Sequence, residues 1–213
     1  MKYPLTGVIL AGGLNKRFYG NNKAFIRIED KRLLDRIYGI FEEVFEEIIL
    51  VTNDPLQYLE WDFKIVTDLF PIRSSLTGIH SGLFHAAKQV AFFAACDIPF
   101  LRKEIVETVV EAFDPKYDAI IPETSAGLEP LCAVYSKNCL KPIEMSLAQQ
   151  ELKIQRFFKT VRIKKIPETV LREKDPDLIS FFNINTPDEL ERANHFIQQN
   201  GWQRKSNEHI KSD

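Results

Sequence analysis

Apolar residues follow two alternating patterns along this chain: short aliphatic runs, and longer segments with apolar positions every three or four residues. The runs at 7–10 and 48–53 have little polar alternation, which is typical of strands buried on both faces. Between them, Leu33, Ile37 and Phe41 repeat at helical spacing and predict a helix over 31–46. Strand, helix and strand form a βαβ unit, whose two strands should be parallel with a right-handed crossover.

This alternation continues through most of the chain. The run at 90–96 is the most apolar, so we place it near the centre of the sheet. The segment 161–166 alternates apolar and basic residues, which favours an edge strand. Strands are expected at 64–68, 90–96, 118–122, 130–135 and 161–166, and helices at 76–87, 105–113, 137–159 (with a break near 149–150) and 187–200.

The last helix has a clear start signal. Thr186 as N-cap, Pro187 at the first helical position and Glu189 three residues after the cap form a capping box. Strands alternating with helices predict an α/β fold with a mainly parallel sheet. We expect one domain over residues 1–201 and a polar, flexible tail over 202–213.

Composition narrows the classes of function. The chain has 213 residues and a net charge of −2, so no charge excess points to nucleic acid or to a membrane surface. Its three cysteines, Cys96, Cys132 and Cys139, have no C-x-x-C spacing and are expected to be core thiols. No run has the ~20 apolar residues of a membrane span. These features predict a soluble cytoplasmic protein.

Candidate chemistry gathers where strands end. Gly12 and Gly13 follow the first strand, and glycines let backbone N–H groups approach an anion closely. Asn53, Asp68 and Asp97 each follow another strand. Because ligands of such sheets bind outside the carboxyl ends of the strands, these positions should share one rim.

Several interpretations of the glycine loop compete. A P-loop requires G-x-x-x-x-G-K-[ST], and Gly20 is followed by Asn21 and Asn22, so that pattern fails. A dinucleotide fingerprint requires G-x-G-x-x-G, which the adjacent Gly12 and Gly13 do not provide, although the fold class is compatible. An ordinary strand-to-helix turn with surface charges also remains open.

Three motifs in order carry a resemblance to the molybdenum cofactor guanylyltransferases. Residues 10–13, followed by Arg17, Gly20 and Lys23, resemble the triphosphate-binding signature of nucleotidyltransferases. Residues 96–100 resemble their metal-binding motif, and residues 182–190 resemble a C-terminal motif of the molybdenum cofactor branch. The resemblance spans about residues 5–196. It implies a three-layer sandwich with a mainly parallel, Rossmann-like sheet, as in nucleotide-diphospho-sugar transferases.

The resemblance also implies a reaction. The terminal phosphate of molybdopterin would attack the α-phosphate of GTP and release pyrophosphate. Arg17, Lys23 and Asp97 would be catalytic, with Asp97 holding Mg²⁺, while Asn183 and Asn185, within an acceptor side formed by about 123–201, would bind the acceptor. The nucleotide-binding residues would be Leu10, Ala11, Gly12, Gly13, Lys23, Asn53, Asp68 and Asp97.

Some positions depart from the family pattern and leave alternatives open. Asn22 stands where the family usually has an acid, and Ser74 and Ser75 replace a Gly-Pro pair. The alternatives are a relative using CTP or another phosphorylated acceptor, and a non-catalytic nucleotide-binding protein. Asp68 as a loop cap and Asn183 as a turn former are simpler interpretations of those two residues. Transient contacts with other cofactor-biosynthesis proteins or recipient apoenzymes are a further expectation of the resemblance.

Overall fold

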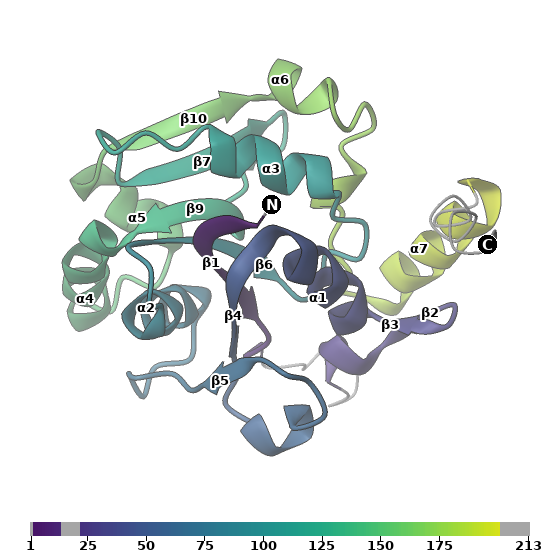
Figure 1. Cartoon of the computed structure of the whole chain (residues 1–213), viewed down its shortest axis with the longest axis horizontal. Coiled ribbons are helices and arrows are strands. Elements are labelled where there is room, and N and C mark those ends of the chain that lie inside the picture. Colours follow the sequence, from purple (N-terminus) through teal and green to yellow (C-terminus); the bar gives the residue numbers. More distant parts are fainter. Residues whose placement is uncertain (1, 14–21, 201–213) are drawn as a thin grey trace.

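The structure, a computed structural model, describes residues 2–13 and 22–200. An eight-stranded sheet crosses the molecule in the order β10–β7–β9–β6–β1–β4–β5, with β8 also paired to β7 (Figure 1). A separate two-stranded hairpin consists of β2 and β3. The strands are β1 (Tyr3–Leu10), β2 (Arg27–Ile28), β3 (Lys31–Arg32), β4 (Phe45–Val51), β5 (Lys64–Val66), β6 (Val90–Ala95), β7 (Ala119–Thr124), β8 (Gly127–Leu128), β9 (Cys132–Ser136) and β10 (Ile163–Pro167).

The pairing confirms the expected α/β fold with a mainly parallel sheet. β1 runs parallel to both β4 and β6, and β5 runs parallel to β4. β9 is antiparallel to its neighbours β6 and β7, while β10 is parallel to β7. The most apolar strand, β6, is central, and the strand with alternating apolar and basic residues, β10, is at an edge, as the sequence predicts.

Helices cover both faces of the sheet and complete a three-layer sandwich (Figure 1). Successive strand residues point to opposite faces. Ile9 and Phe92 therefore pack with α1 and α3, whereas Val8 and Phe93 pack with α2 and α4. The helices are α1 (Leu33–Val44), α2 (Ser75–His85), α3 (Lys103–Glu111), α4 (Leu140–Ala148), α5 (Ile154–Phe157), α6 (Glu168–Arg172) and α7 (Pro187–Asn200), with short 3₁₀ helices η2 (Lys23–Phe25), η3 (Pro55–Tyr58), η4 (Lys137–Cys139), η5 (Phe158–Thr160) and η6 (Ile179–Phe181).

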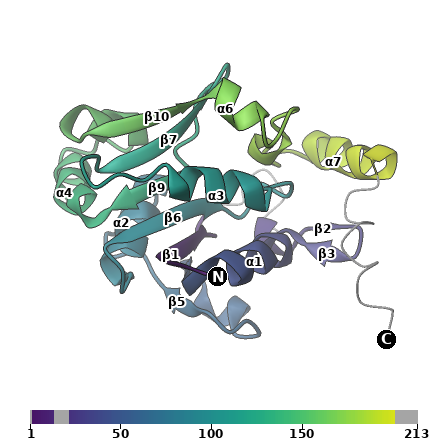
Figure 2. The ribbon, with the colours of Figure 1, turned by 45° about the horizontal axis from the view of Figure 1, so that its top comes forward.

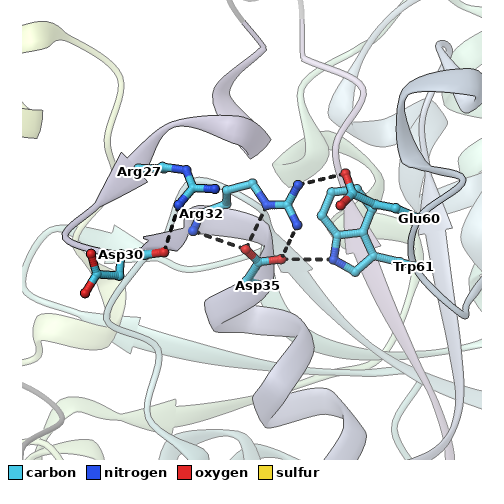
Figure 3. Close-up of polar contacts among 6 residues, drawn as sticks. All are labelled: Arg27, Asp30, Arg32, Asp35, Glu60 and Trp61. Atoms are coloured by element: carbon cyan, nitrogen blue, oxygen red, sulfur yellow. Dashed lines mark hydrogen bonds and ion pairs between the residues drawn. The ribbon is translucent and has the colours of Figure 1, made fainter.

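The start of α1 differs from the sequence prediction, because its first two expected residues belong to the β2–β3 hairpin. Figure 3 shows the polar cluster at this junction. The Arg32 side chain donates to Asp35 at 2.8 Å and to Glu60 at 2.7 Å, and its guanidinium lies 4.2 Å from the centre of the Trp61 ring. The Trp61 indole also donates to Asp35 at 3.0 Å. These contacts fasten the hairpin and the start of α1 to the segment after η3.

The C-terminal helix forms as its capping box predicts. The Glu189 backbone N–H donates to the Thr186 hydroxyl at 3.3 Å, and the Thr186 N–H donates to the Glu189 carboxylate at 2.9 Å. Figure 2 shows α7 extending from one end of the sandwich beside the hairpin. Its buried residues Ala193 and Ile197 pack in a small core with Ile28, Leu33, Phe100 and Ile184.

The described part of the chain also bears on the expected helix break and on the three cysteines. The break near 149–150 is confirmed, since Gln150 has a positive φ of 57° between α4 and α5. The three cysteines are buried free thiols, as predicted. Residues 2–13 and 22–200 contain no helix that is long and apolar enough to cross a membrane. The tail expected at 202–213 lies outside the described residues.

Candidate active site

A pocket of about 380 Å³ opens at the carboxyl ends of β1, β4 and β6 and at the loop after β5. Gly12, Asn53, Asp68 and Asp97 each stand two residues beyond the end of their strand, on the rim where the sequence places them. Eight of the candidate site residues line the pocket: Leu10, Ala11, Gly12, Gly13, Lys23, Asp68, Asp97 and Asn185. The size and position are those of a small-molecule site of an α/β sheet.

Two described candidates, Asn53 and Asn183, are not among the residues that line the pocket. Asn53 contacts Asp68, which does line it. Asn183 donates its side-chain amide to the Phe181 carbonyl at 3.0 Å, which is the local turn bond that the simpler interpretation predicts. Arg17 lies outside the described residues.

Gly12 and Gly13 follow the end of β1 directly and line the pocket. Ala11 N–H donates to the Val51 carbonyl at 2.9 Å, so the chain stays paired with β4 up to the first glycine. Among the described residues, the nearest atom to a Cβ at Gly12 would be the Asn53 amide at 3.8 Å, and a Cβ at Gly13 would meet none within 4 Å. The packing of these residues therefore leaves open space beside both glycines, where a ligand could approach the backbone.

One end of the pocket carries a charged cluster assembled from three distant parts of the chain. The Lys23 ammonium lies 3.3 Å from Asp97 Oδ2 and donates to Asn185 Oδ1 at 2.8 Å. The side chains of Lys23 and Asp97 are 16% and 19% exposed. A partly desolvated ammonium beside open space is suited to bind a phosphate, because Coulomb attraction strengthens as water is excluded. We call Lys23, Asp97 and Asn185 the phosphate end.

Local contacts hold each member of the phosphate end in place. Asn22 caps η2 by accepting from the Ala24 N–H at 3.1 Å, and its amide donates to Tyr58 at 2.7 Å. This asparagine, which replaces the family's usual acid, thus positions the neighbouring Lys23. The Ile184 N–H donates to the Asp97 carbonyl at 2.8 Å and brings the segment before α7 against the end of β6.

Asp97 also has the features of a metal ligand. Its second carboxylate oxygen, Oδ1, is buried and accepts no hydrogen bond within the described ranges. Such an oxygen is costly to bury unless a donor or a cation satisfies it. Residues 2–13 and 22–200 hold no group of three or more His, Cys, Asp or Glu residues that could bind a metal ion. A single carboxylate with a buried oxygen that accepts no described hydrogen bond is compatible with Mg²⁺, which typically takes one or two carboxylates with substrate phosphates and water.

Asp68 and Arg73 also line the pocket, and together with Asn53, which contacts Asp68, they form a second group that we call the base end. The Asn53 amide donates to Asp68 Oδ2 at 2.7 Å, and the Asp68 N–H donates to Asn53 Oδ1 at 3.2 Å. Burial raises the pKa of Asp68, and the Asn53 bond and the Arg73 charge partly offset that rise. The amide thus fixes the orientation of a half-buried carboxylate.

Several residues that line the pocket were not predicted as site residues from the sequence. Arg73, Val51 and Leu131 line the pocket but belong to no recognised motif. Cys96 also lines it, and burial raises the pKa of its thiol to about 12, so it is no thiolate nucleophile at neutral pH. Only the position of Arg73, in a loop that follows a parallel strand, could have suggested it in advance.

The start of α2 also lines the pocket, through Ser74, Ser75 and Gly78. The Ser74 hydroxyl accepts from the Thr77 N–H at 3.1 Å, so it serves as the N-cap of the helix. A Cβ at Gly78 would lie 3.2 Å from Leu10 Cδ2, a tight contact that brings the helix close to β1. Ser74 thus helps to keep the helix start in place.

Most of the chain is similar in sequence to known proteins. Residues 7–166 match the family model described as the MobA-like NTP transferase domain. A molybdenum cofactor guanylyltransferase from Desulfosudis oleivorans is 44% identical over 194 residues, which cover 91% of this chain and 96% of the relative. A probable molybdenum cofactor guanylyltransferase from Natranaerobius thermophilus is 34% identical over 198 residues, again covering 91% and 96%.

The arrangement of the elements is also similar to that of a solved structure. Molybdopterin-guanine dinucleotide biosynthesis protein A from Archaeoglobus fulgidus superposes with a TM-score of 0.81. The two proteins are 29% identical, and the match covers 92% of this chain and all of the other. The likeness therefore extends over nearly the whole chain and is not confined to the sheet.

Proposed function

Because this chain belongs to the molybdenum cofactor guanylyltransferase family, we propose that it transfers GMP from GTP to the terminal phosphate of molybdopterin. It is a nucleotidyltransferase with the fold of nucleotide-diphospho-sugar transferases, as the sequence resemblance implied. The observation that carries the proposal is the phosphate end, where Lys23, Asp97 and Asn185 meet beside an open glycine pair.

The reaction needs positioning and charge neutralisation more than covalent help. An oxygen of the molybdopterin phosphate forms a bond to the α-phosphorus of GTP. The bond between that phosphorus and the oxygen bridging to the β-phosphate breaks, and pyrophosphate leaves with the electron pair. Both substrates are anionic, so the pocket must supply positive charge and N–H donors where they meet.

The residues of the phosphate end suit these requirements. Backbone N–H groups at Gly12 and Gly13 would approach the triphosphate through the open space beside them. The Lys23 ammonium would stabilise charge that develops at the α-phosphate. Neutralisation of the β- and γ-phosphates by Arg17 stays a prediction, since this residue lies outside the described ranges.

Asp97 would hold Mg²⁺ through the buried oxygen that accepts no hydrogen bond from described residues. The ion would supply Lewis-acid charge neutralisation at the phosphates. Asp97 at the same time orients Lys23 through its other oxygen, Oδ2. One carboxylate would thus serve both cations of the site.

At the base end, the Asp68 carboxylate would accept the two donors of the guanine pairing edge, N1–H and the 2-amino group. Asn53 is not among the lining residues and hydrogen-bonds to Asp68, so we assign it to positioning Asp68. On the acceptor side, formed by about 123–201, Asn185 is well placed because it lines the pocket. A contact between Asn183 and the acceptor, contacts with other proteins and a cytoplasmic location stay predictions.

A nucleotide-selectivity assay tests the proposal. Pyrophosphate release is measured with molybdopterin, Mg²⁺ and either GTP or CTP, with the Asp97→Asn variant as the control for catalysis at this site. We expect turnover with GTP to exceed turnover with CTP by at least tenfold. Equal or faster turnover with CTP would assign the cytidylyl reaction. GTP binding without product formation would indicate a non-catalytic nucleotide-binding protein.

A further inference from the structure

Arg73 is a cation at the base end that neither the sequence motifs nor the proposed reaction uses. It lies in the loop between β5 and α2, is exposed, and lines the pocket beside Asp68. Within the described part of the chain it makes no hydrogen bond or ion pair. Its guanidinium, with five N–H donors in a planar fork, is therefore available to a ligand.

The carboxylate of Asp68, which lines the same pocket, uses only one of its two oxygens in a described hydrogen bond. Its Oδ2 accepts from Asn53 at 2.7 Å, whereas Oδ1 accepts nothing from the residues that the structure describes. The Arg73 charge acts on this carboxylate and partly offsets the rise in the pKa of Asp68 that burial causes. The base end thus presents an oriented acceptor group and a donor fork on neighbouring parts of one wall.

Guanine is the base whose two adjacent edges match this pair. N1–H and the 2-amino group are donors, and next to them O6 and N7 are acceptors. A carboxylate takes the first two, and a guanidinium donating to O6 and N7 takes the second two, which is the commonest specific contact of arginine with guanine. We propose that Arg73 is a specificity-determining residue that binds the O6/N7 edge of the GTP base.

This inference rests on the proposed guanylyl transfer and adds to it. The proposed function assigns the glycine pair, Lys23 and Asp97 to the triphosphate, which leaves Asp68 and Arg73 as charged lining residues available to the base. Adenine has a donor amino group where guanine has O6, and two donors would then face each other at Arg73. Cytosine has no imidazole edge and so no counterpart of N7.

Two GTP analogues separate the two contacts. 7-Deaza-GTP replaces N7 by C–H and keeps every group that Asp68 would bind. ITP lacks the 2-amino group and keeps O6 and N7. The experiment measures kcat/KM for GTP, 7-deaza-GTP and ITP with molybdopterin and Mg²⁺, in the unmodified protein and in the Arg73→Ala and Arg73→Lys variants. Arg156→Ala, which removes an equally exposed arginine from α5, is the control for the lost charge.

We expect the unmodified protein and Arg156→Ala to prefer GTP over 7-deaza-GTP by about tenfold, within the range for one bidentate arginine–guanine contact. Arg73→Ala should use both nucleotides equally while keeping its preference for GTP over ITP. Arg73→Lys keeps the charge but not the fork, so it should resemble Arg73→Ala.

Three results would overturn the inference while leaving guanylyl transfer in place. They are equal use of GTP and 7-deaza-GTP by the unmodified protein, an undiminished preference in Arg73→Ala, and a rise only in the KM for molybdopterin. The last result would assign Arg73 to the acceptor phosphate. Absence of pyrophosphate release from GTP in the unmodified protein would instead contradict the proposed function.

Discussion

The two ends of the pocket are built in different ways. At the base end, Asn53 and Asp68 are 15 residues apart and follow the adjacent parallel strands β4 and β5. At the phosphate end, Lys23 meets Asp97 across 74 residues and Asn185 across 162 residues. The base end can form once two neighbouring strands pair, whereas the phosphate end requires the last part of the chain to return to the first.

The groups that contact the aspartate also differ in charge between the two ends. At the base end a neutral amide, and no ion-pair partner among the described residues, orients the Asp68 carboxylate. An ammonium, a carboxylate and an amide satisfy one another at the phosphate end, although Asp97 Oδ1 accepts nothing from them. We therefore propose that the base end recognises the nucleotide base and that the phosphate end neutralises the charge of the phosphates. Substitutions should therefore separate selectivity from rate.

The largest effect is expected at the phosphate end. Lys23→Ala and Asp97→Asn each remove one charge from the point where phosphate charge develops, so the rate of pyrophosphate formation at saturating GTP should fall by about 10²–10³-fold. Single-turnover kinetics measure that rate directly. The preference for GTP over ITP should stay unchanged in the residual activity. A rate within about threefold of the unmodified protein would remove either residue from the catalytic assignment.

Alanine at the glycine pair should have the next largest effect. Gly12→Ala and Gly13→Ala create no close contact with the protein, so thermal stability should stay near that of the unmodified chain. Activity should fall by about ten- to a hundredfold because the new methyl group occupies the space between backbone and phosphate. Gly39→Ala, on the exposed side of α1, is the matched control. Full activity of both pocket variants would show that no ligand approaches this backbone.

Asn185→Ala tests how the end of the chain contributes. The substitution removes the 2.8 Å bond to the Lys23 ammonium, and we expect kcat to fall about tenfold through poorer positioning. Nucleotide selectivity should not change, because the base end does not depend on this residue. Steady-state kinetics with both substrates varied give the two parameters. A rise in the molybdopterin KM would show that Asn185 also contacts the acceptor, as proposed, whereas an unchanged kcat would contradict its role in positioning Lys23.

Asp68→Asn should have the smallest effect on the rate of the reaction. Unlike most substitutions of a buried polar group, it should raise the stability of the protein near pH 7. Burial raises the pKa of Asp68 above its usual 3.8, so the folded protein binds this proton more tightly than the unfolded chain. The resulting stabilisation is complete below the unfolded pKa and is lost as the pH rises through the folded one. Near pH 7 the ionised, half-buried carboxylate therefore costs stability.

The variant removes that cost, so its melting temperature near pH 7 should rise by about 1–2 °C, with a smaller difference at pH 4. Its preference for GTP over ITP should fall several-fold. Thermal melts at the two pH values and the nucleotide comparison provide the measurements. A lower melting temperature at neutral pH would indicate that the Asn53–Asp68 bond outweighs the burial of charge.

The elements could be predicted from local patterns where those patterns were strong. β6 and β10 were placed correctly in the sheet, because a wholly apolar run and an apolar–basic alternation indicate burial on two faces or exposure at an edge. The β2–β3 hairpin was missed. Its strands are two residues long, and their order depends on the cluster around Arg32 and Trp61 rather than on a periodic pattern.

The sequence by itself determined the rim of the pocket. Gly12, Asn53, Asp68 and Asp97 follow strands whose apolar runs require burial, and parallel strands place their carboxyl ends together. Tertiary structure alone decided which of these groups meet. Lys23, Asp97 and Asn185 come together because α7 packs on the hairpin and Ile184 bonds to the loop after β6. Local sequence cannot specify such contacts, since they depend on long-range burial and on closing a loop of more than a hundred residues.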